Sequence, residues 1–377
     1  MLRVIISTIG TSLLTNQINR SADGEKSWYN QLRDTANLKA DSTPKEVLAI
    51  IEELKNRAIG KLTQSQIHQI RLASAELNGI YGIYQEKLLD GKQDIHYLIS
   101  TDTLQGRATA EIVDRFLKKN GLVNVSIYTP TGLSTASNQA FSEGIDDIIV
   151  WLRKEIIPLR DKYKICFNLV GSFKSLQGYL NTIGMFYADE IIYIFEGKDS
   201  NLITIPRLPI KVDESLIEPH TTQLTLINAG YKLPSDKTVG IPETLIGDFN
   251  GQKVLSTWGQ LIWDESKINL LSRSLLDFPC LQYTDTFRSD YNKIRDKQEK
   301  VQLHEDLAKV SSLLTDSQGD TSILKQHPGF QYDKYSNRKD DIGHFRVTQG
   351  LRISCVSTNG TLTLRRYGKE PDVNKNP

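Results

Sequence analysis

The chain has 377 residues, of which 39% are hydrophobic and 24% charged, so it is long enough for two or three domains with cores of their own. Its 46 Lys and Arg against 45 Asp and Glu exclude a globally basic nucleic-acid coat. The charge is uneven, because residues 321–377 hold ten Lys and Arg against five Asp and Glu. This basic C-terminal part predicts a polyanionic partner.

The cysteines, the histidines and the apolar runs exclude several classes of protein. Three cysteines far apart in the chain predict no disulfide framework, and the six histidines lack the spacing of zinc ligands. The sequence begins directly with a strand-like segment without a secretory cleavage pattern, and no apolar run is long enough to span a membrane. We therefore expect a cytoplasmic protein without a metal, a cofactor or a membrane contact.

Short apolar strands alternate with helical stretches over the first two hundred residues. The strands are nearly continuous apolar runs, which is typical of strands buried on both faces. Such alternation predicts an α/β fold, a Rossmann-like doubly wound parallel sheet with helices on both faces. The expected strands are 4–8, 95–100, 123–128, 164–170 and 190–195, and the expected helices include 108–118 and 176–187.

Four of these strands end in small hydroxyl and glycine residues, in loops 9–12, 101–103, 131–134 and 171–174. Doubly wound sheets bind ligands outside the carboxyl ends of their strands, where helix N-termini attract anions. For any one loop, helix capping is the alternative explanation. Four loops at one sheet edge favour an anion site, although the glycine motifs of dinucleotide and P-loop sites are missing.

The N-terminal half resembles the CARF family, the Rossmann-like sensors of CRISPR systems. The resemblance rests on residues 7–12, 168–174 and 192–197, followed by a proline-rich segment at 205–210. It implies a domain over residues 1–210 that forms a homodimer and binds a cyclic oligoadenylate, with cyclic tetra-adenylate as the expected activator. The pocket residues that it implies are Thr8, Gly10, Thr11, Ser12, Gly171, Ser172, Phe173 and Lys174. Asp102, Gln105 and Ser134 are further candidates, from loop position alone.

Residues 211–284 carry weaker patterns. Asn250-Gly251 between two apolar stretches predicts a hairpin turn, and residues 264–276 predict a helix that ends before Pro279. We expect this segment to be a linker between two domains.

The last ninety residues predict helices followed by an antiparallel sheet. Apolar residues from 287 to 314 have helical spacing, and strand patterns cover 344–347, 351–356 and 361–367. A three-residue loop at 348–350 keeps one face apolar and places Arg346 opposite Arg352. A two-residue turn at 359–360 places Ser354 opposite Arg365. The predicted polar face holds His344, Arg346, Arg352, Ser354 and Arg365, and the apolar face holds Phe345, Ile353, Cys355 and Leu364.

Two arginines directly opposite each other destabilise a sheet, and no carboxylate of these strands shares their face. This pattern favours an anion site over a solvated face. Guanidinium groups bind phosphate through two hydrogen bonds, so a phosphodiester is the expected anion. Histidine titrates near neutrality, which makes His344 a candidate general base or acid for cleavage beside a ribose.

This C-terminal part resembles the RelE family of mRNA interferases, through residues 343–347, 351–353 and 362–368. The resemblance implies a small α+β domain over residues 285–377 that cleaves mRNA in the ribosomal A site without a metal. The catalytic candidates are His344, Arg346, Arg352, Arg365 and Lys369. Many family members end in a basic residue and a tyrosine, but residues 370–374 offer neither, so the general base is left open.

Together the two resemblances imply a CRISPR-associated mRNA interferase, a CARF–RelE fusion that cyclic oligoadenylate activates. The competing hypothesis is a non-catalytic CARF regulator whose basic C-terminal domain binds nucleic acid. Arg338 and His344 also fit the loose spacing of HEPN ribonucleases, but His344 begins a strand pattern rather than lying on a helix. As an addition to the first hypothesis, the sensor pocket could also cleave its own activator.

Overall fold

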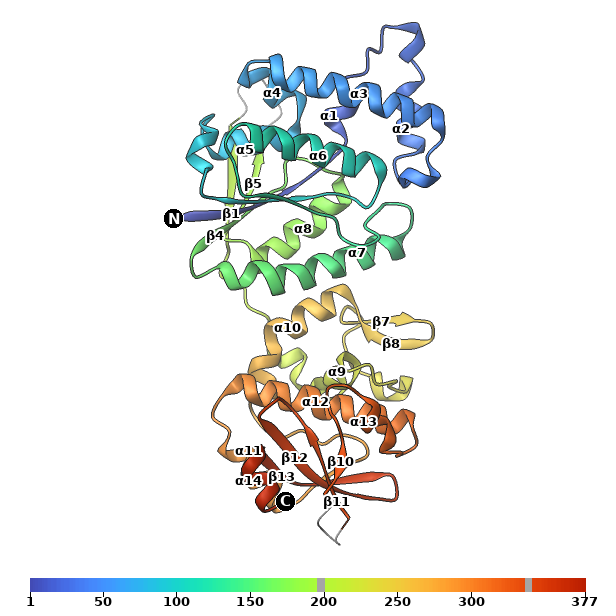
Figure 1. Ribbon diagram of the computed structural model, residues 1–377, viewed down its shortest axis with the longest axis vertical. Helices are drawn as coiled ribbons and strands as arrows, with labels where there is room; N and C mark the ends of the chain where they lie inside the picture. Colours follow the sequence, from blue (N-terminus) through green and yellow to red (C-terminus); the bar gives the residue numbers. More distant parts are fainter. Residues whose placement is uncertain (195–200, 336–340) are drawn as a thin grey trace. The chain divides into compact units, whose positions relative to one another are not determined.

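The computed structural model describes residues 1–194, 201–335 and 341–377, and it divides into two compact units, Met1–Ile210 and Lys211–Pro377 (Figure 1). Phe195, Glu196 and Gly197 of the CARF resemblance and Arg338 of the HEPN alternative lie outside the described residues. Within those ranges, no helix combines the length and hydropathy needed to cross a membrane.

The first unit is built around a six-stranded sheet. Its strands are β1 (Leu2–Thr8), β2 (Ile95–Ile99), β3 (Val125–Tyr128), β4 (Tyr163–Asn168), β5 (Glu190–Ile194) and β6 (Leu202–Pro206). They lie in the order β3-β2-β1-β4-β5-β6, and only β6 is antiparallel to its neighbour. The predicted parallel sheet is confirmed. The strand order reverses between β1 and β4, which is where doubly wound sheets bind ligands.

Helices cover both faces of this sheet, as predicted. They are α1 (Ser12–Thr15), α2 (Trp28–Asp34), α3 (Lys45–Gln64), α4 (Ile67–Ala73), α5 (Ala75–Ile83), α6 (Leu104–Lys119), α7 (Asn138–Trp151) and α8 (Lys174–Tyr187). α3, α5 and α6 share a buried cluster with Ile5 of β1 and Cys166 of β4. On the opposite face α8 packs so closely that Gly184 lies against Phe167 and Ile191 (Figure 1).

The second unit is an α+β structure. Its helices are α9 (Thr221–Asn228), α10 (Thr257–Leu271), α11 (Asp285–Lys293), α12 (Lys297–Asp316), α13 (Ser322–Gln326) and α14 (Glu370–Lys375). Its strands are β7 (Ile246–Phe249), β8 (Gln252–Leu255), β9 (Leu281–Tyr283), β10 (Asp333–Lys334), β11 (Ile342–Arg346), β12 (Leu351–Thr358) and β13 (Thr361–Lys369). The main sheet has the order β10-β11-β12-β13-β9, and only β9 runs parallel to its neighbour.

The apolar face of this sheet forms the core of the second unit. Phe345, Ile353 and Leu364 are fully buried in one cluster with Phe287 of α11 and Leu307 of α12. The opposite face of β11 and β12 carries the polar residues. The fold class, a doubly wound parallel sheet followed by a small α+β part, therefore agrees with the sequence-based prediction.

The register of the hairpin β11–β12 is confirmed, because Arg346 lies opposite Arg352 and Phe345 opposite Ile353. Along β12–β13 one prediction is wrong. A β-bulge after Ser354 shifts the register, so that Arg366, not Arg365, lies opposite Ser354. The extra residue of a bulge breaks the two-residue period on which the prediction relied. Hydroxyl groups of Thr284 and Thr286 donate to the carbonyl of Arg365, which holds the bulge in place.

Residues 211–284, predicted as a linker, belong to the second unit. Leu224 of α9 and Trp263 of α10 share a buried cluster with Val301 of α12, and β9 extends the main sheet. The predicted hairpin at Asn250-Gly251 forms between β7 and β8. α10 begins at Thr257, earlier than predicted, because the Ser256 side chain accepts a hydrogen bond from the Gly259 amide, 2.9 Å away.

Candidate functional site

A cavity of about 380 Å³ lies at the carboxyl ends of β1 and β4, where the strand order of the first sheet reverses. Most of its lining comes from loops that follow four of the strands, and the segment after α2 contributes Asn37. The lining includes Gly10, Thr11, Ser12, Asn37, Thr101, Thr103, Thr135, Gly171, Ser172 and Phe173.

Two glycines of the loops after β1 and β4 have close neighbours, Gly10 in the opposite loop and Gly171 in α5. A Cβ on Gly10 would lie 3.0 Å from the Ser172 amide nitrogen, and one on Gly171 would lie 2.3 Å from Glu76 Oε1. The hydroxyl of Thr8 donates to the carbonyl of Gly171, so the ends of β1 and β4 are joined directly. A side chain at either position would therefore force its neighbours to move.

Glu76 lies behind these loops, fully buried in the first turn of α5. Its carboxyl group accepts hydrogen bonds from the Gly10 amide at 2.6 Å and from the Ser74 hydroxyl at 2.7 Å. Burial raises the pKa of Glu76, and the hydrogen bonds from Ser74 and Gly10 offset part of this rise. In the sequence Glu76 looks like an ordinary charged residue at a helix start, so no pattern pointed to it.

Two hydroxyl groups at this cavity are buried without a hydrogen-bond partner among the described residues, Ser12 Oγ and Ser172 Oγ. Ser172 also has a φ of 108°, a conformation that non-glycine residues adopt at a cost. Buried polar groups are nearly always paired in native proteins. These two hydroxyls are therefore unpaired donors beside the cavity.

The cavity gathers part of the predicted pocket. Gly10, Thr11, Ser12, Gly171, Ser172 and Phe173 line it. Thr8 is buried behind it, and Lys174 is an exposed side chain at the first position of α8.

The three candidates taken from loop position alone lie away from the cavity lining. Asp102 forms ion pairs with Lys39 and Arg107, at 2.8 and 2.7 Å. Burial alone would raise the pKa of Asp102, but hydrogen bonds from these two cations outweigh it and lower the pKa. Gln105 donates to the carbonyl of Leu32 at 2.8 Å, and Ser134 accepts from an amide within its own loop. The loops predicted from their position do contribute to the cavity. The residues of these loops that line it are threonines, not the three predicted side chains.

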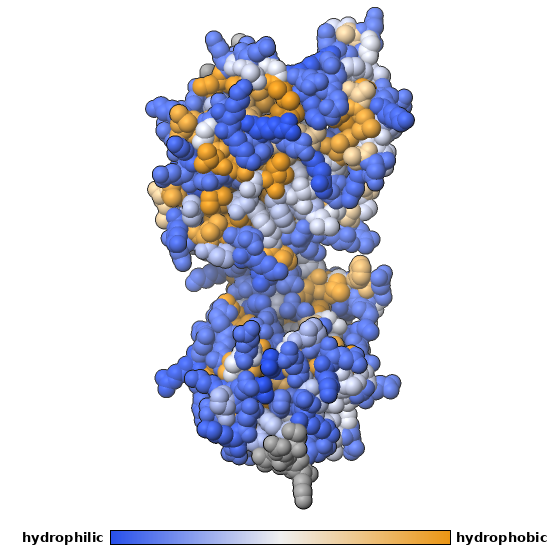
Figure 2. All heavy atoms as spheres, in the orientation of Figure 1, coloured by the Kyte–Doolittle hydropathy of each residue, from blue (hydrophilic) through white to orange (hydrophobic). Residues whose placement is uncertain are grey.

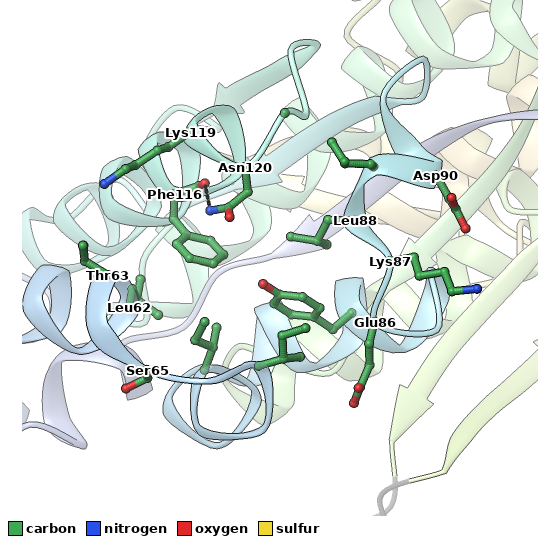
Figure 3. Close-up of a pocket in the computed structure, with 15 residues that line it drawn as sticks. Leu62, Thr63, Ser65, Glu86, Lys87, Leu88, Asp90, Phe116, Lys119 and Asn120 are labelled. Carbon is green, nitrogen blue, oxygen red and sulfur yellow. Dashed lines mark hydrogen bonds between the residues drawn. The ribbon is translucent and has the colours of Figure 1, made fainter.

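A larger hollow of about 890 Å³ lies elsewhere in the first unit (Figure 3). Its residues precede β2 or lie at the C-terminal end of α6 and just after it, so it lies at the amino ends of β2 and β3, away from the glycine loops. Leu62, Leu88 and Phe116 make it partly apolar, and its charged side chains have both signs. None of the predicted pocket residues lines it, and mixed charges do not favour a polyanion.

The polar face of β11 and β12 carries the second candidate site. Among the described residues, no hydrogen bond or ion pair holds the guanidinium group of Arg346. Its neighbour Arg352 is 12% exposed and forms an ion pair of 2.5 Å with Glu370 of α14. One of the two facing arginines is therefore neutralised by a residue that the sequence analysis did not assign to the site.

Three polar atoms on this face are buried without a partner among the described residues, namely His344 Nδ1, Arg352 Nε and Ser354 Oγ. Ser354 lies directly opposite His344 and is fully buried. The ring of Tyr335 lies against the imidazole, with 4.5 Å between ring centroids. Burial lowers the pKa of His344 below its usual range, and the positive charge of Arg352 lowers it further. A lowered pKa favours the uncharged imidazole at neutral pH, the form that accepts a proton.

The remaining catalytic candidates lie along β13. Lys369 is exposed at its end, and Arg365 has no ion pair within the described part of the chain. Arg366, which the bulge places opposite Ser354, is held by Asp290 of α11 at 2.7 Å. The structure therefore brings together His344, Arg352 and Arg346, with Ser354 among them.

The chain thus has an α/β unit with a cavity at the carboxyl ends of its strands, and an α+β unit with two facing arginines on one sheet face. Residues 71–208 match the family model of a CRISPR-associated protein (Cas_APE2256). The match runs from α4 to β6 and includes the loop Gly171–Phe173, but neither the loop after β1 nor the second unit. This similarity supports a CRISPR-associated protein.

Proposed function

We propose that this protein is a ribonuclease that a cyclic oligoadenylate activates, with cyclic tetra-adenylate as the activator and ribosome-bound mRNA in the cytoplasm as the substrate. The observation that carries the proposal is the pair of facing arginines beside an uncharged, half-buried histidine in the second unit. The similarity of the first unit to a CRISPR-associated protein supports a nucleotide messenger as the signal.

The chemistry of the first cavity suits such a messenger. Backbone amides, two unpaired hydroxyls and close-packed glycines allow a phosphate–ribose chain to approach the loops. A volume of about 380 Å³ is at the small end for a ligand pocket, so it holds only part of a cyclic tetranucleotide. A second copy of the chain, related by a two-fold axis, supplies the rest of the site in this proposal. Apolar patches on the first unit in Figure 2 offer surface for such a homodimer.

In the second unit the proposed reaction is cleavage of RNA by its own ribose. Uncharged His344 takes the proton of the 2′-hydroxyl, and the 2′-oxygen forms a bond to the adjacent phosphorus. The bond from phosphorus to the 5′-oxygen breaks, and the leaving oxygen takes a proton from solvent. Arg346 and Arg352 stabilise the additional negative charge on the phosphorane. The products are a 2′,3′-cyclic phosphate and a 5′-hydroxyl end.

Replacing His344 by Gln should remove a titration from the pH profile of cleavage. Because His344 accepts a proton, wild-type activity rises with pH through its pKa, and this rise lies below pH 6.5 since burial and Arg352 lower that pKa. The variant should be slower and lack this rise. Rates of mRNA cleavage between pH 5 and 8 measure it, and an unchanged profile in the variant contradicts the assignment.

Replacing Lys174 by Ala should weaken activator binding, because a cation at the first position of α8 attracts phosphate groups. The side chain is exposed, so the expected loss is moderate, about threefold to tenfold in Kd. Calorimetric titration with cyclic tetra-adenylate measures it, with Lys118→Ala on α6 as the control. If wild type and Lys174→Ala bind the activator with equal affinity, Lys174 is not part of the activator site.

A further inference from the structure

The chain ends in a short helix that packs on the polar side of the main sheet of the second unit. α14 begins directly after β13, and its Val373 is buried, with a methyl group near Gly368 of β13. Asn374 Oδ1 accepts a hydrogen bond of 2.8 Å from the hydroxyl of Tyr335. Arg366 donates to the carbonyl of Asn376 at 3.3 Å. The helix is thus held at several points over β12 and β13.

Glu370, the first residue of this helix, forms an ion pair with Arg352, which in our proposal binds the scissile phosphate. Glu370 lies 2.5 Å from Arg352, and its side chain is 36% exposed. A guanidinium group binds a carboxylate and a phosphate in the same way, through parallel N–H donors. Glu370 therefore occupies a position on Arg352 that a phosphodiester would take.

Part of the rest of the site is buried, whereas His344 and Arg346 keep some exposed surface. Ser354 has no exposed surface, and His344 Nδ1, Arg352 Nε and Ser354 Oγ lack both solvent and a partner among the described residues. Unpaired buried polar atoms are unusual in native proteins. Three such atoms, one of them on the internally paired Arg352, point to a site that binds a polar group.

We propose that α14 is an autoinhibitory segment, in which the Glu370 carboxylate takes the place of the scissile phosphate and the helix covers the cleavage site. The inference rests on the proposed ribonuclease function and adds its regulation. RNA reaches His344 and Arg352 only after Glu370 releases the guanidinium group. The alternative role of Glu370, that of a general base, predicts the opposite effect of its replacement.

The test is mRNA cleavage on translating ribosomes by the full-length Glu370→Gln variant without activator. We expect the activator-free rate to rise several-fold, because the variant loses the charge that holds the closed state. Asp372→Asn is the matched control, since it removes a carboxylate of the same helix that has no ion pair in the described part of the chain. Asn374→Ala, which loosens the helix without touching Arg352, should also raise this rate.

An unchanged or lower activator-free rate for both Glu370→Gln and Asn374→Ala overturns the inference. Loss of cleavage by Glu370→Gln in the presence of cyclic tetra-adenylate also overturns it, and assigns Glu370 to the reaction instead. Cleavage by the wild-type protein with activator tests the proposed ribonuclease function separately from the autoinhibition. If wild type cleaves and the variants do not gain activity, only the autoinhibition is wrong.

Discussion

Replacing Arg346 or Arg352 by Gln should reduce mRNA cleavage on ribosomes about a hundredfold, the usual effect of losing one transition-state contact. Both side chains lie on the polar face beside His344, and Gln keeps much of their volume while removing the charge. Activator affinity should not change, since the cavity that we assign to the activator belongs to the first unit.

Neither arginine variant should lose much stability, and Arg346→Gln should be the more stable of the two. Arg346→Gln removes repulsion from Arg352 and no ion pair of the described chain, so the melting temperature should stay or rise. Arg352→Gln leaves Glu370 without its partner, which costs little because that carboxylate is partly exposed. Arg288→Gln on α11 is the control and should cleave normally. Normal cleavage by both site variants removes these arginines from the active site.

Replacing Gly171 by Ala should reduce activator affinity at least tenfold and destabilise the first unit. The added Cβ would lie 2.3 Å from Glu76 Oε1, so the buried Glu76 side chain or the loop after β4 must shift. Overpacking of this kind costs about 1–3 kcal/mol. Gly178→Ala on α8 is the matched control, because no atom lies within 4 Å of its added Cβ. The control should bind cyclic tetra-adenylate as wild type does.

Calorimetric titration and thermal unfolding of the two alanine variants measure these effects. If Gly171→Ala binds the activator as tightly as Gly178→Ala, the loop after β4 does not form the activator site. If Gly171→Ala binds the activator weakly but unfolds at the wild-type temperature, the Glu76 side chain moves aside for the added methyl group without a cost in stability.

Strand pattern and turn chemistry predicted much of the fold. The apolar strands of the first unit occupy buried positions in a parallel sheet, for which continuous apolar runs are a strong signal. The hairpin β11–β12 has the predicted register, because only one loop length kept Phe345 and Ile353 on the same face. The prediction was right where the residues of one hairpin or one strand allowed only one arrangement.

The missed features depend on contacts between distant residues. The bulge at Arg365 is held by Thr284 and Thr286, some eighty residues away, and no alternation within β13 shows it. The side chain of Glu76 reaches the glycine loops from a helix. The sequence assigns Glu370 no role, because residues 370–374 hold neither a basic residue nor a tyrosine, yet the Glu370 carboxylate pairs with Arg352. Such partners become visible only when the chain has folded.

One measurement tests the central claim directly: incubation of the full-length protein with translating ribosomes, with and without cyclic tetra-adenylate, followed by mapping of mRNA 5′ ends. The account predicts new ends inside codons at the ribosomal A site, bearing 5′-hydroxyl groups and appearing only when the activator is present, and their loss in Arg346→Gln. Binding of RNA without any new ends, with or without the activator, would contradict the ribonuclease and favour the non-catalytic regulator.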